Sequence, residues 1–147
     1  MSATRTMANY ISNLKFEDLS ANVAEKGRLA VLDGVGNAIG GYGVELATTF
    51  LSLAKETGGA NEGATLIGDG SKVSVSMGAF GNGALATMLD FCDDRGMGRL
   101  AAWLGAMAVP AALAAGEPRG ISGKELITSV VAGYECGARL LDSMDVS

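Results

Sequence analysis

The chain has 147 residues, of which 48% are hydrophobic, so it is long enough for one domain with a real core and is not a disordered protein. Its formal net charge of −5 leaves no basic surface for phosphate groups, which argues against nucleic acid and anionic membranes as partners. The chain contains no histidine, and its two cysteines, Cys92 and Cys136, match no zinc spacing, so we predict no metal site.

Two stretches of the chain bear on its expected location. The first fourteen residues lack the apolar region of a signal peptide. The longest uncharged run, Leu100 to Gly116, contains Pro110 and is shorter than the roughly 20 apolar residues of a membrane span. We therefore read this run as a buried helix, and predict a soluble, cytoplasmic protein with reduced thiols.

Helical periodicity dominates the first half of the chain, and no segment alternates as a strand would. Three helices are predicted here. The first covers Thr4 to Leu14, and the second covers Ala21 to about Ile39 with Ser20 as its N-cap. The third covers Val44 to Thr57, with Gly58 as its C-cap.

The second half begins with a Gly-rich stretch that predicts two short strands or an extended loop near residues 64–75, with a turn at Gly68 to Gly70. Three more helices follow in the prediction: Val75 to Leu89 capped by Ser74, Leu100 to Ala115 interrupted or kinked at Pro110, and one that opens at the Ser122 capping box and runs to Met144. The fold class is therefore mainly α: a bundle of about six helices in one domain.

Several glycines lie inside these predicted helices, where they lower helix stability and need a reason. Close packing against a neighbouring helix is the reason we favour for Gly27, Gly34 and Gly36. The Gly-x-x-x-Gly pairs at 36/40 and 133/137 predict tight helix contacts, inside the domain or across a subunit interface. A dinucleotide fingerprint at 34–41 is disfavoured because its spacing is wrong and a helix precedes it. The stretch Gly68 to Lys72 is too short for a phosphate-binding loop.

An acidic cluster, Asp90, Asp93 and Asp94, follows the fourth predicted helix. Crowded carboxylates can raise one another's pKa, which suits a general acid or base, and on a helix Asp90 and Asp94 would share a face. Arg95 and Arg99 either neutralise the cluster or hold a substrate carboxylate. From the residues alone, a functional site and a solvated loop remain equally open.

The stretch NGALATMLDFCDD at residues 82–94, with LDGVGNAIGG before it and VPAALAAGEPRGISGKELITSVVAGYECGARL after it, resembles the N-terminal part of the MmgE/PrpD family. This family includes 2-methylcitrate dehydratase, cis-aconitate decarboxylase and iminodisuccinate epimerase. The match extends over essentially the whole chain, so residues 1–147 are expected to form the N-terminal portion of the family's large helical domain.

The resemblance implies chemistry on small di- or tricarboxylates without a cofactor: a proton is removed beside a carboxylate, with loss of water, loss of carbon dioxide or inversion. It places Asp90 and Asp93, from the family's D-F-x-D stretch, in the active site as catalytic residues. Asp94, Arg95 and Arg99 are expected to bind the substrate. The family is usually homodimeric.

The sequence also departs from the family. Trp103-Leu104-Gly105 stands where the family has a His-Pro-Gly or His-Pro-Ser segment, so a histidine expected to assist proton transfer is missing. The chain also covers about a third of the usual family length. We therefore expect it to act together with a second polypeptide that supplies the missing parts, or to be a non-catalytic helical interaction domain. A third alternative is a protein that binds small carboxylates without turnover.

Overall fold

The computed structural model describes residues 2–59, 63–93 and 102–144. In this part of the chain, helices dominate and a two-stranded antiparallel hairpin is the one sheet. The elements are α1 (Ala3–Asn13), η1 (Phe16–Asp18), α2 (Ala21–Tyr42), α3 (Ala47–Gly58), β1 (Ala64–Thr65), β2 (Lys72–Val73), α4 (Val75–Thr87), α5 (Leu104–Gly116), η2 (Glu117–Arg119) and α6 (Gly123–Met144). The mainly α prediction is confirmed.

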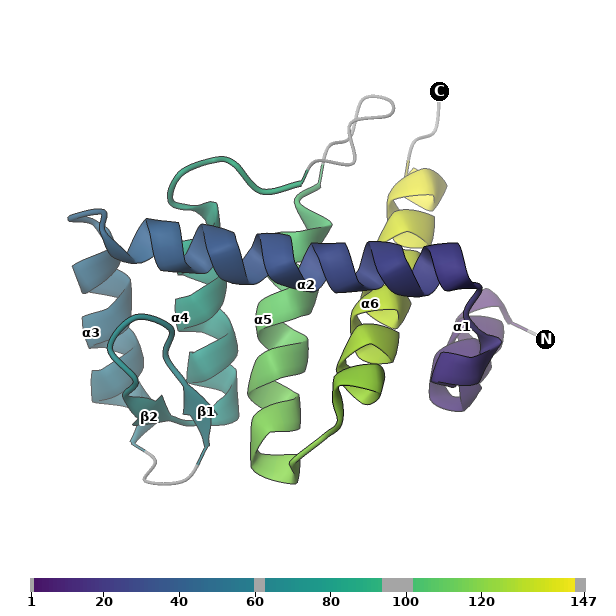
Figure 1. Cartoon of the computed structure of the whole chain (residues 1–147), viewed down its shortest axis with the longest axis horizontal. Coiled ribbons are helices and arrows are strands. Elements are labelled where there is room, and N and C mark those ends of the chain that lie inside the picture. Colours follow the sequence, from purple (N-terminus) through teal and green to yellow (C-terminus); the bar gives the residue numbers. More distant parts are fainter. Residues whose placement is uncertain (1, 60–62, 94–101, 145–147) are drawn as a thin grey trace.

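The helices form two layers. Figure 1 shows α3, α4, α5 and α6 standing side by side in sequence order, with the long α2 lying across them. The helix α2 packs on α4, α5 and α6, while α1 lies at the end of the row near α6. The segment that follows α4 begins on the side of the upright helices where α2 crosses them (Figure 1), and it contains Asp90 and Asp93.

Three helix starts follow from local sequence. The hydroxyl oxygens of Ser20 and Ser74 accept hydrogen bonds from the Val23 and Met77 amides at 3.3 and 3.4 Å. At the start of α6 the Ser122 hydroxyl accepts from the Glu125 amide at 3.3 Å, and the Glu125 carboxylate accepts from the Ser122 amide at 2.7 Å. Each cap satisfies an amide that has no partner inside its helix, so all three predicted caps are confirmed.

Several helix ends differ from the prediction. The C-cap of α3 is Gly59, in the left-handed region at φ 43°, and Gly58 is the last helical residue. The helix α4 ends at Thr87, two residues before the predicted Leu89. The helix α5 continues through Pro110, so an interruption there is wrong, while the alternative of a kink stays a prediction. Pro110 is itself fully buried in the core, where its packing offsets the missing hydrogen bond.

Close packing explains most of the helical glycines. A Cβ on Gly27 would lie 2.9 Å from Ile127 and Val131 of α6, and one on Gly34 would lie 2.9 Å from Val109 of α5. Gly133 and Gly137 face α5 in the same way. Gly36 makes no such contact with the described residues: it has no neighbour within 4 Å and lies on the exposed side of α2, so a contact across a subunit interface stays a prediction.

The hairpin β1–β2 is fastened to the bundle by side chains. The buried Asn82 of α4 accepts a hydrogen bond from the Ile67 amide at 2.8 Å and donates to the Thr65 carbonyl at 2.9 Å. The Glu117 carboxylate accepts from the Thr65 amide at 2.6 Å and also contacts Lys72. The predicted turn is present, with Gly68 and Gly70 at φ 106° and 75°.

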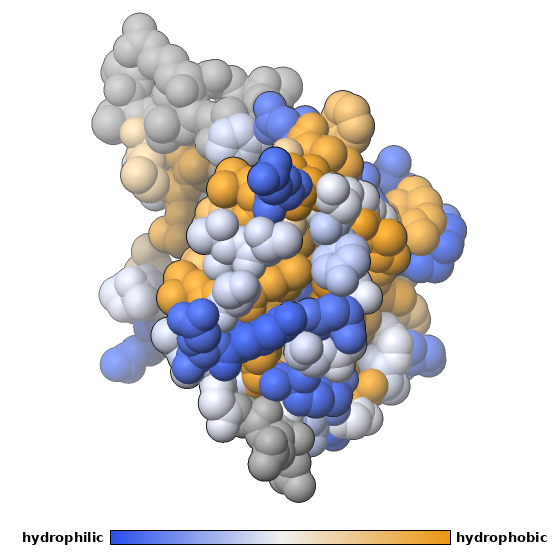
Figure 2. All heavy atoms as spheres, turned by 90° about the vertical axis from the view of Figure 1, so that its left-hand side faces the viewer, coloured by the Kyte–Doolittle hydropathy of each residue, from blue (hydrophilic) through white to orange (hydrophobic). Residues whose placement is uncertain are grey.

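The core lies between α2, α3, α4 and α5 and consists mostly of small and aliphatic side chains, among them Leu51, Leu66, Leu85 and Val109. Large apolar side chains are also exposed, as on the outer side of α2, where Leu32 and Ile39 are 62% and 60% exposed. Figure 2 shows apolar surface on the α3 end of the molecule, divided by hydrophilic side chains. Among the described helices, none combines the length and apolar character needed to cross a membrane.

Candidate functional site

Asp90 and Asp93, the two described members of the acidic cluster, do not lie on a helix. Because α4 ends at Thr87, Asp90 follows in an irregular segment, with φ 54° in the left-handed region and its side chain exposed. Non-glycine residues rarely adopt this conformation, although aspartate does so more readily than most. Asp90 is therefore not helical, and the expectation that it shares a helix face with Asp94 is wrong. Asp94, Arg95 and Arg99 lie outside the described residues.

Asp93 is the member of the cluster with defined partners. Its Oδ1 accepts a hydrogen bond from the Gly105 amide at 3.0 Å, and its Oδ2 accepts one from the Tyr134 hydroxyl at 2.6 Å. The side chain is half-buried. One carboxylate thus joins the segment after α4 to the start of α5 and the middle of α6. Asp90 has no comparable contact among the described residues.

The bond to Gly105 also caps the start of α5. Gly105 is the second residue of this helix, and the N-cap residue, Trp103, provides no side-chain cap. Asp93 therefore satisfies a free amide at the helix start as an N-cap residue would, and its negative charge faces the positive end of the helix dipole. A Cβ on residue 105 would lie 2.2 Å from Asp93 Oδ1 and 2.6 Å from the Tyr134 hydroxyl, so only glycine fits here.

Further carboxylate groups lie near Asp93, and their negative charge affects the pKa values of its neighbours. Burial raises the pKa of Tyr134 far above its ordinary value, as do the hydrogen bond to Asp93 and the charges of Asp93 and Asp33. Burial also raises the pKa of the Cys92 thiol, and the nearby carboxylates of Asp90, Asp93 and Asp33 raise it further. Both groups therefore stay protonated near neutral pH, so Tyr134 donates its hydrogen bond and Cys92 is a poor nucleophile.

A cavity of about 400 Å³ opens beside Asp93, between facing sides of α2 and α6. Its eleven lining residues are Val23, Lys26, Gly27, Ala30, Asp93, Leu104, Val130, Val131, Tyr134, Glu135 and Ala138. Seven of these are apolar, and Lys26 is the one cation among them. Glu135 is paired with Arg139 at 2.7 Å. An apolar cavity of this size with a few polar groups is typical of a small-molecule site.

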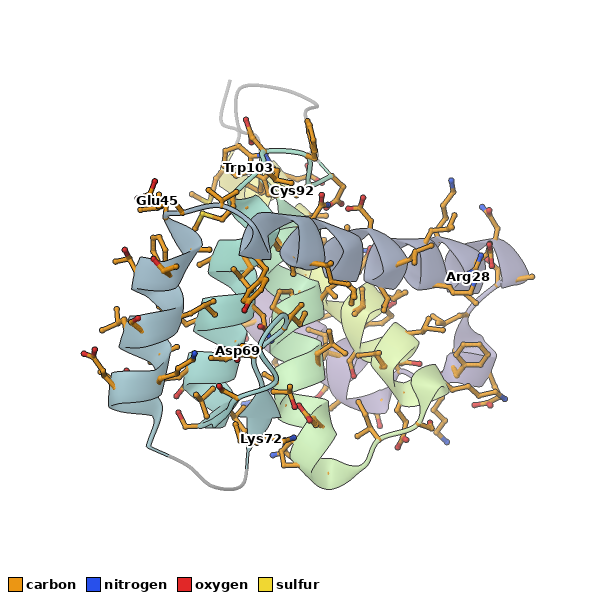
Figure 3. All side chains as sticks on the ribbon, turned by 60° about the vertical axis from the view of Figure 1, so that its left-hand side comes forward. Arg28, Glu45, Asp69, Lys72, Cys92 and Trp103 are labelled. Carbon is orange, nitrogen blue, oxygen red and sulfur yellow. The ribbon has the colours of Figure 1, made fainter. Side chains whose placement is uncertain are left out.

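The segment that replaces the family's histidine borders this cavity. Leu104 lines it and Gly105 contacts Asp93, whereas Trp103 points to a second groove between α4 and α5. Figure 3 shows Cys92 and Trp103 at the same end of the bundle, above α2 and far from Arg28. Sequence reasoning missed Gly105 and Tyr134 as site residues, because they lie 12 and 41 residues from Asp93 along the chain and belong to no acidic cluster.

The described side chains of the site show free hydrogen-bonding capacity and no evident metal-binding group. Within the described ranges, no three or more Cys, Asp or Glu side chains are grouped to hold a metal ion. Cys92 and Cys136 are both half-buried and form no disulfide. Each oxygen of Asp93 accepts one hydrogen bond from the described residues, so each keeps a free lone pair.

One of three comparisons with known proteins gave a match. Neither the curated proteins nor the solved structures gave a match. The family model of the MmgE/PrpD N-terminal domain matches residues 5–147, a range that begins in the first turn of α1 and includes all the later helices. The chain therefore belongs to the MmgE/PrpD family.

Proposed function

We propose that the chain forms one wall of the active site of a lyase or isomerase that acts on a small di- or tricarboxylate such as 2-methylcitrate. Asp93 is the base that takes a proton from the carbon beside a carboxylate. One observation supports this proposal above the others: Asp93, the second aspartate of the D-F-x-D stretch, lines a small, mostly apolar cavity. A dehydratase reaction is our first choice, with epimerisation and decarboxylation as the alternatives within the family.

The cavity offers a place for each part of such a substrate. The Lys26 ammonium group is available for one carboxylate, and Val23, Ala30 and Val131 provide an apolar wall for the carbon chain. In a dehydration, the C–H proton passes to Asp93 and the electron pair of that bond forms the carbon–carbon double bond. The hydroxyl group leaves from the neighbouring carbon as water, and the proton that it needs is the one held by Asp93. Further carboxylates need further cations, and we assign these to Arg95 and Arg99, with Asp94 beside them.

The remaining walls of the site come from elsewhere in this proposal. A lyase site needs groups from several elements within reach of one substrate, and the described lining of this cavity offers two carboxylates, one of them paired with Arg139, together with one phenol and one lysine. We propose that a second copy or a second polypeptide supplies the others, in the cytoplasm. The exposed apolar side chains of α2, such as Leu32 and Ile39, support an assembly of this kind.

Product formation tests the proposal. The purified chain is incubated with 2-methylcitrate, cis-aconitate and iminodisuccinate, alone and together with the product of the adjacent gene, and products are followed by NMR. We expect turnover of at least one substrate in the combined sample. Absence of turnover in every combination would count against the proposal.

A second candidate, a non-catalytic helical interaction domain, is favoured by a different observation. Both oxygens of Asp93 already hold the fold together, which is a sufficient structural role. This candidate predicts that Asp93→Asn affects stability and nothing else. A binding protein without turnover is the third candidate, and calorimetry with citrate-like ligands would detect it, with Arg95 and Arg99 as the expected anion-binding residues.

A further inference from the structure

Tyr134 lies on α6, far along the chain from the D-F-x-D stretch. Of the two hydrogen bonds described for the Asp93 side chain, the one from the Tyr134 hydroxyl is the shorter. The donor–acceptor distance of 2.6 Å is typical of a charge-assisted O–H···O bond. Tyr134 lies 41 residues from Asp93 along the chain and also lines the cavity. It therefore touches both the carboxylate and the space that a ligand would fill.

The carboxylate of Asp93 would be poorly fixed without this bond. Asp93 lies in the irregular segment after α4, and the neighbouring Asp90 and Phe91 are exposed, Phe91 by 76%. The Gly105 amide holds one oxygen only. A carboxylate held at one oxygen can still rotate about the bond to its chain, whereas one held at both oxygens has a fixed plane.

The two donors have fixed positions of their own. The Gly105 amide belongs to the first turn of α5, and the lack of a side chain at residue 105 lets Asp93 and Tyr134 approach it. Tyr134 lies in the middle of α6, one turn after the buried Val130. Two helices thus hold the two oxygens of one side chain.

From this geometry we infer that Tyr134 is a positioning residue for Asp93: it fixes the plane of the carboxylate so that its free lone pairs face the cavity between α2 and α6. This inference rests on the proposed role of Asp93 as a base. The Tyr134 hydroxyl donates its proton to the hydrogen bond with Asp93 Oδ2, and burial and the neighbouring carboxylates hold its pKa far above neutrality, so Tyr134 is not itself the base. In a chain without histidine, a backbone amide and a phenol orient the base.

The variant Tyr134→Phe removes the hydroxyl and keeps the ring. In the reconstituted enzyme we expect kcat to fall about tenfold to a hundredfold while KM changes less than about twofold, because a misplaced base slows the reaction without removing substrate contacts. The matched control is Tyr42→Phe, on α2, whose ring packs against Gly68 away from the cavity. We expect it to leave kcat and KM as in the wild type.

A second measurement separates positioning from a loss of fold. In an Asp93→Asn background, adding Tyr134→Phe should change the residual rate less than about twofold, since the base is already gone. A Tyr134→Phe enzyme with wild-type kcat, or one whose effect persists undiminished in the Asp93→Asn background, would overturn the inference and leave the proposed function standing. A wild-type protein without turnover would overturn both the inference and the proposed function. An Asp93→Asn enzyme with the wild-type rate would overturn the proposed role of Asp93 as the base.

Discussion

Replacing Asp93 with alanine removes the acceptor for two hydrogen bonds and the cap of α5 in one step. The Gly105 amide and the Tyr134 hydroxyl, now 3.0 and 2.6 Å from the carboxylate, both lose their partner. A hydrogen bond to a charged group stabilises a protein by about 1.5–3 kcal/mol when both partners are shielded from water. Because Asp93 is half-buried, water replaces part of this loss, and we expect Asp93→Ala to lower the free energy of unfolding by about 2–3 kcal/mol.

Urea unfolding followed by circular dichroism measures this change. The control is Asp90→Asn, which removes a charge three residues away; Asp90 is exposed and asparagine tolerates its positive φ, so the expected change is below about 0.5 kcal/mol. In a double-mutant cycle, Asp93→Ala and Tyr134→Phe should couple by about 1–2 kcal/mol. An Asp93→Ala protein within about 0.5 kcal/mol of the wild type, or no coupling to Tyr134, would refute the proposed contacts.

Three further predictions concern other parts of the molecule. Gly41→Ala places a Cβ 2.0 Å from the Leu85 carbonyl and should lower the free energy of unfolding by more than about 2 kcal/mol, whereas Gly36→Ala has open space and should raise it by about 0.5–1 kcal/mol; urea unfolding of the pair checks both. Asp90→Ala should cost about 1 kcal/mol because alanine at φ 54° is strained, and Asp90→Gly should cost less; the opposite order would contradict the backbone conformation. Burial raises the pKa of the Glu117 carboxyl group, but the hydrogen bonds from Lys72 and Thr65 outweigh burial, so the net pKa in the folded protein is lowered. The carboxylate therefore stabilises the fold at a pH above its pKa in the unfolded chain, and this stabilisation is lost as the pH falls through its pKa in the folded protein. The urea midpoint should therefore fall less steeply on acidification in Glu117→Gln than in the wild type, and identical slopes would contradict this.

The features that the sequence predicts correctly are those set by residues close together in the chain. Ser20, Ser74 and Ser122 cap helices through contacts three residues away, and such contacts can be read from the sequence. The order of six helices and the position of the hairpin are right for the same reason. The end of α4 is harder, because nothing in the residues from Thr87 to Leu89 stops a helix.

The site depends on contacts that local sequence does not contain. Asp93 could be singled out because it belongs to a D-F-x-D stretch, but its partners are 12 and 41 residues away. Tyr134 shares the apolar stripe of α6 with Val130, and only the packing of α6 against α5 brings its hydroxyl to a carboxylate. Gly36 illustrates the reverse case: its spacing from Gly40 suggested a helix contact, yet it faces outward because α2 turns its other side to the bundle.

The most direct test of Asp93 as a base is the exchange of substrate hydrogen with solvent deuterium. Removal of a proton beside a carboxylate is the step that dehydration and epimerisation share. NMR in D₂O detects it as deuterium at that carbon where the carbon is reprotonated, and as the unsaturated product where the hydroxyl group leaves first. With 2-methylcitrate and iminodisuccinate as probes, we predict exchange or elimination at the carbon beside a carboxylate in the reconstituted wild type and a loss of about a hundredfold or more in Asp93→Asn. The same rate of proton removal in both proteins, or neither exchange nor elimination in the wild type, would contradict the account.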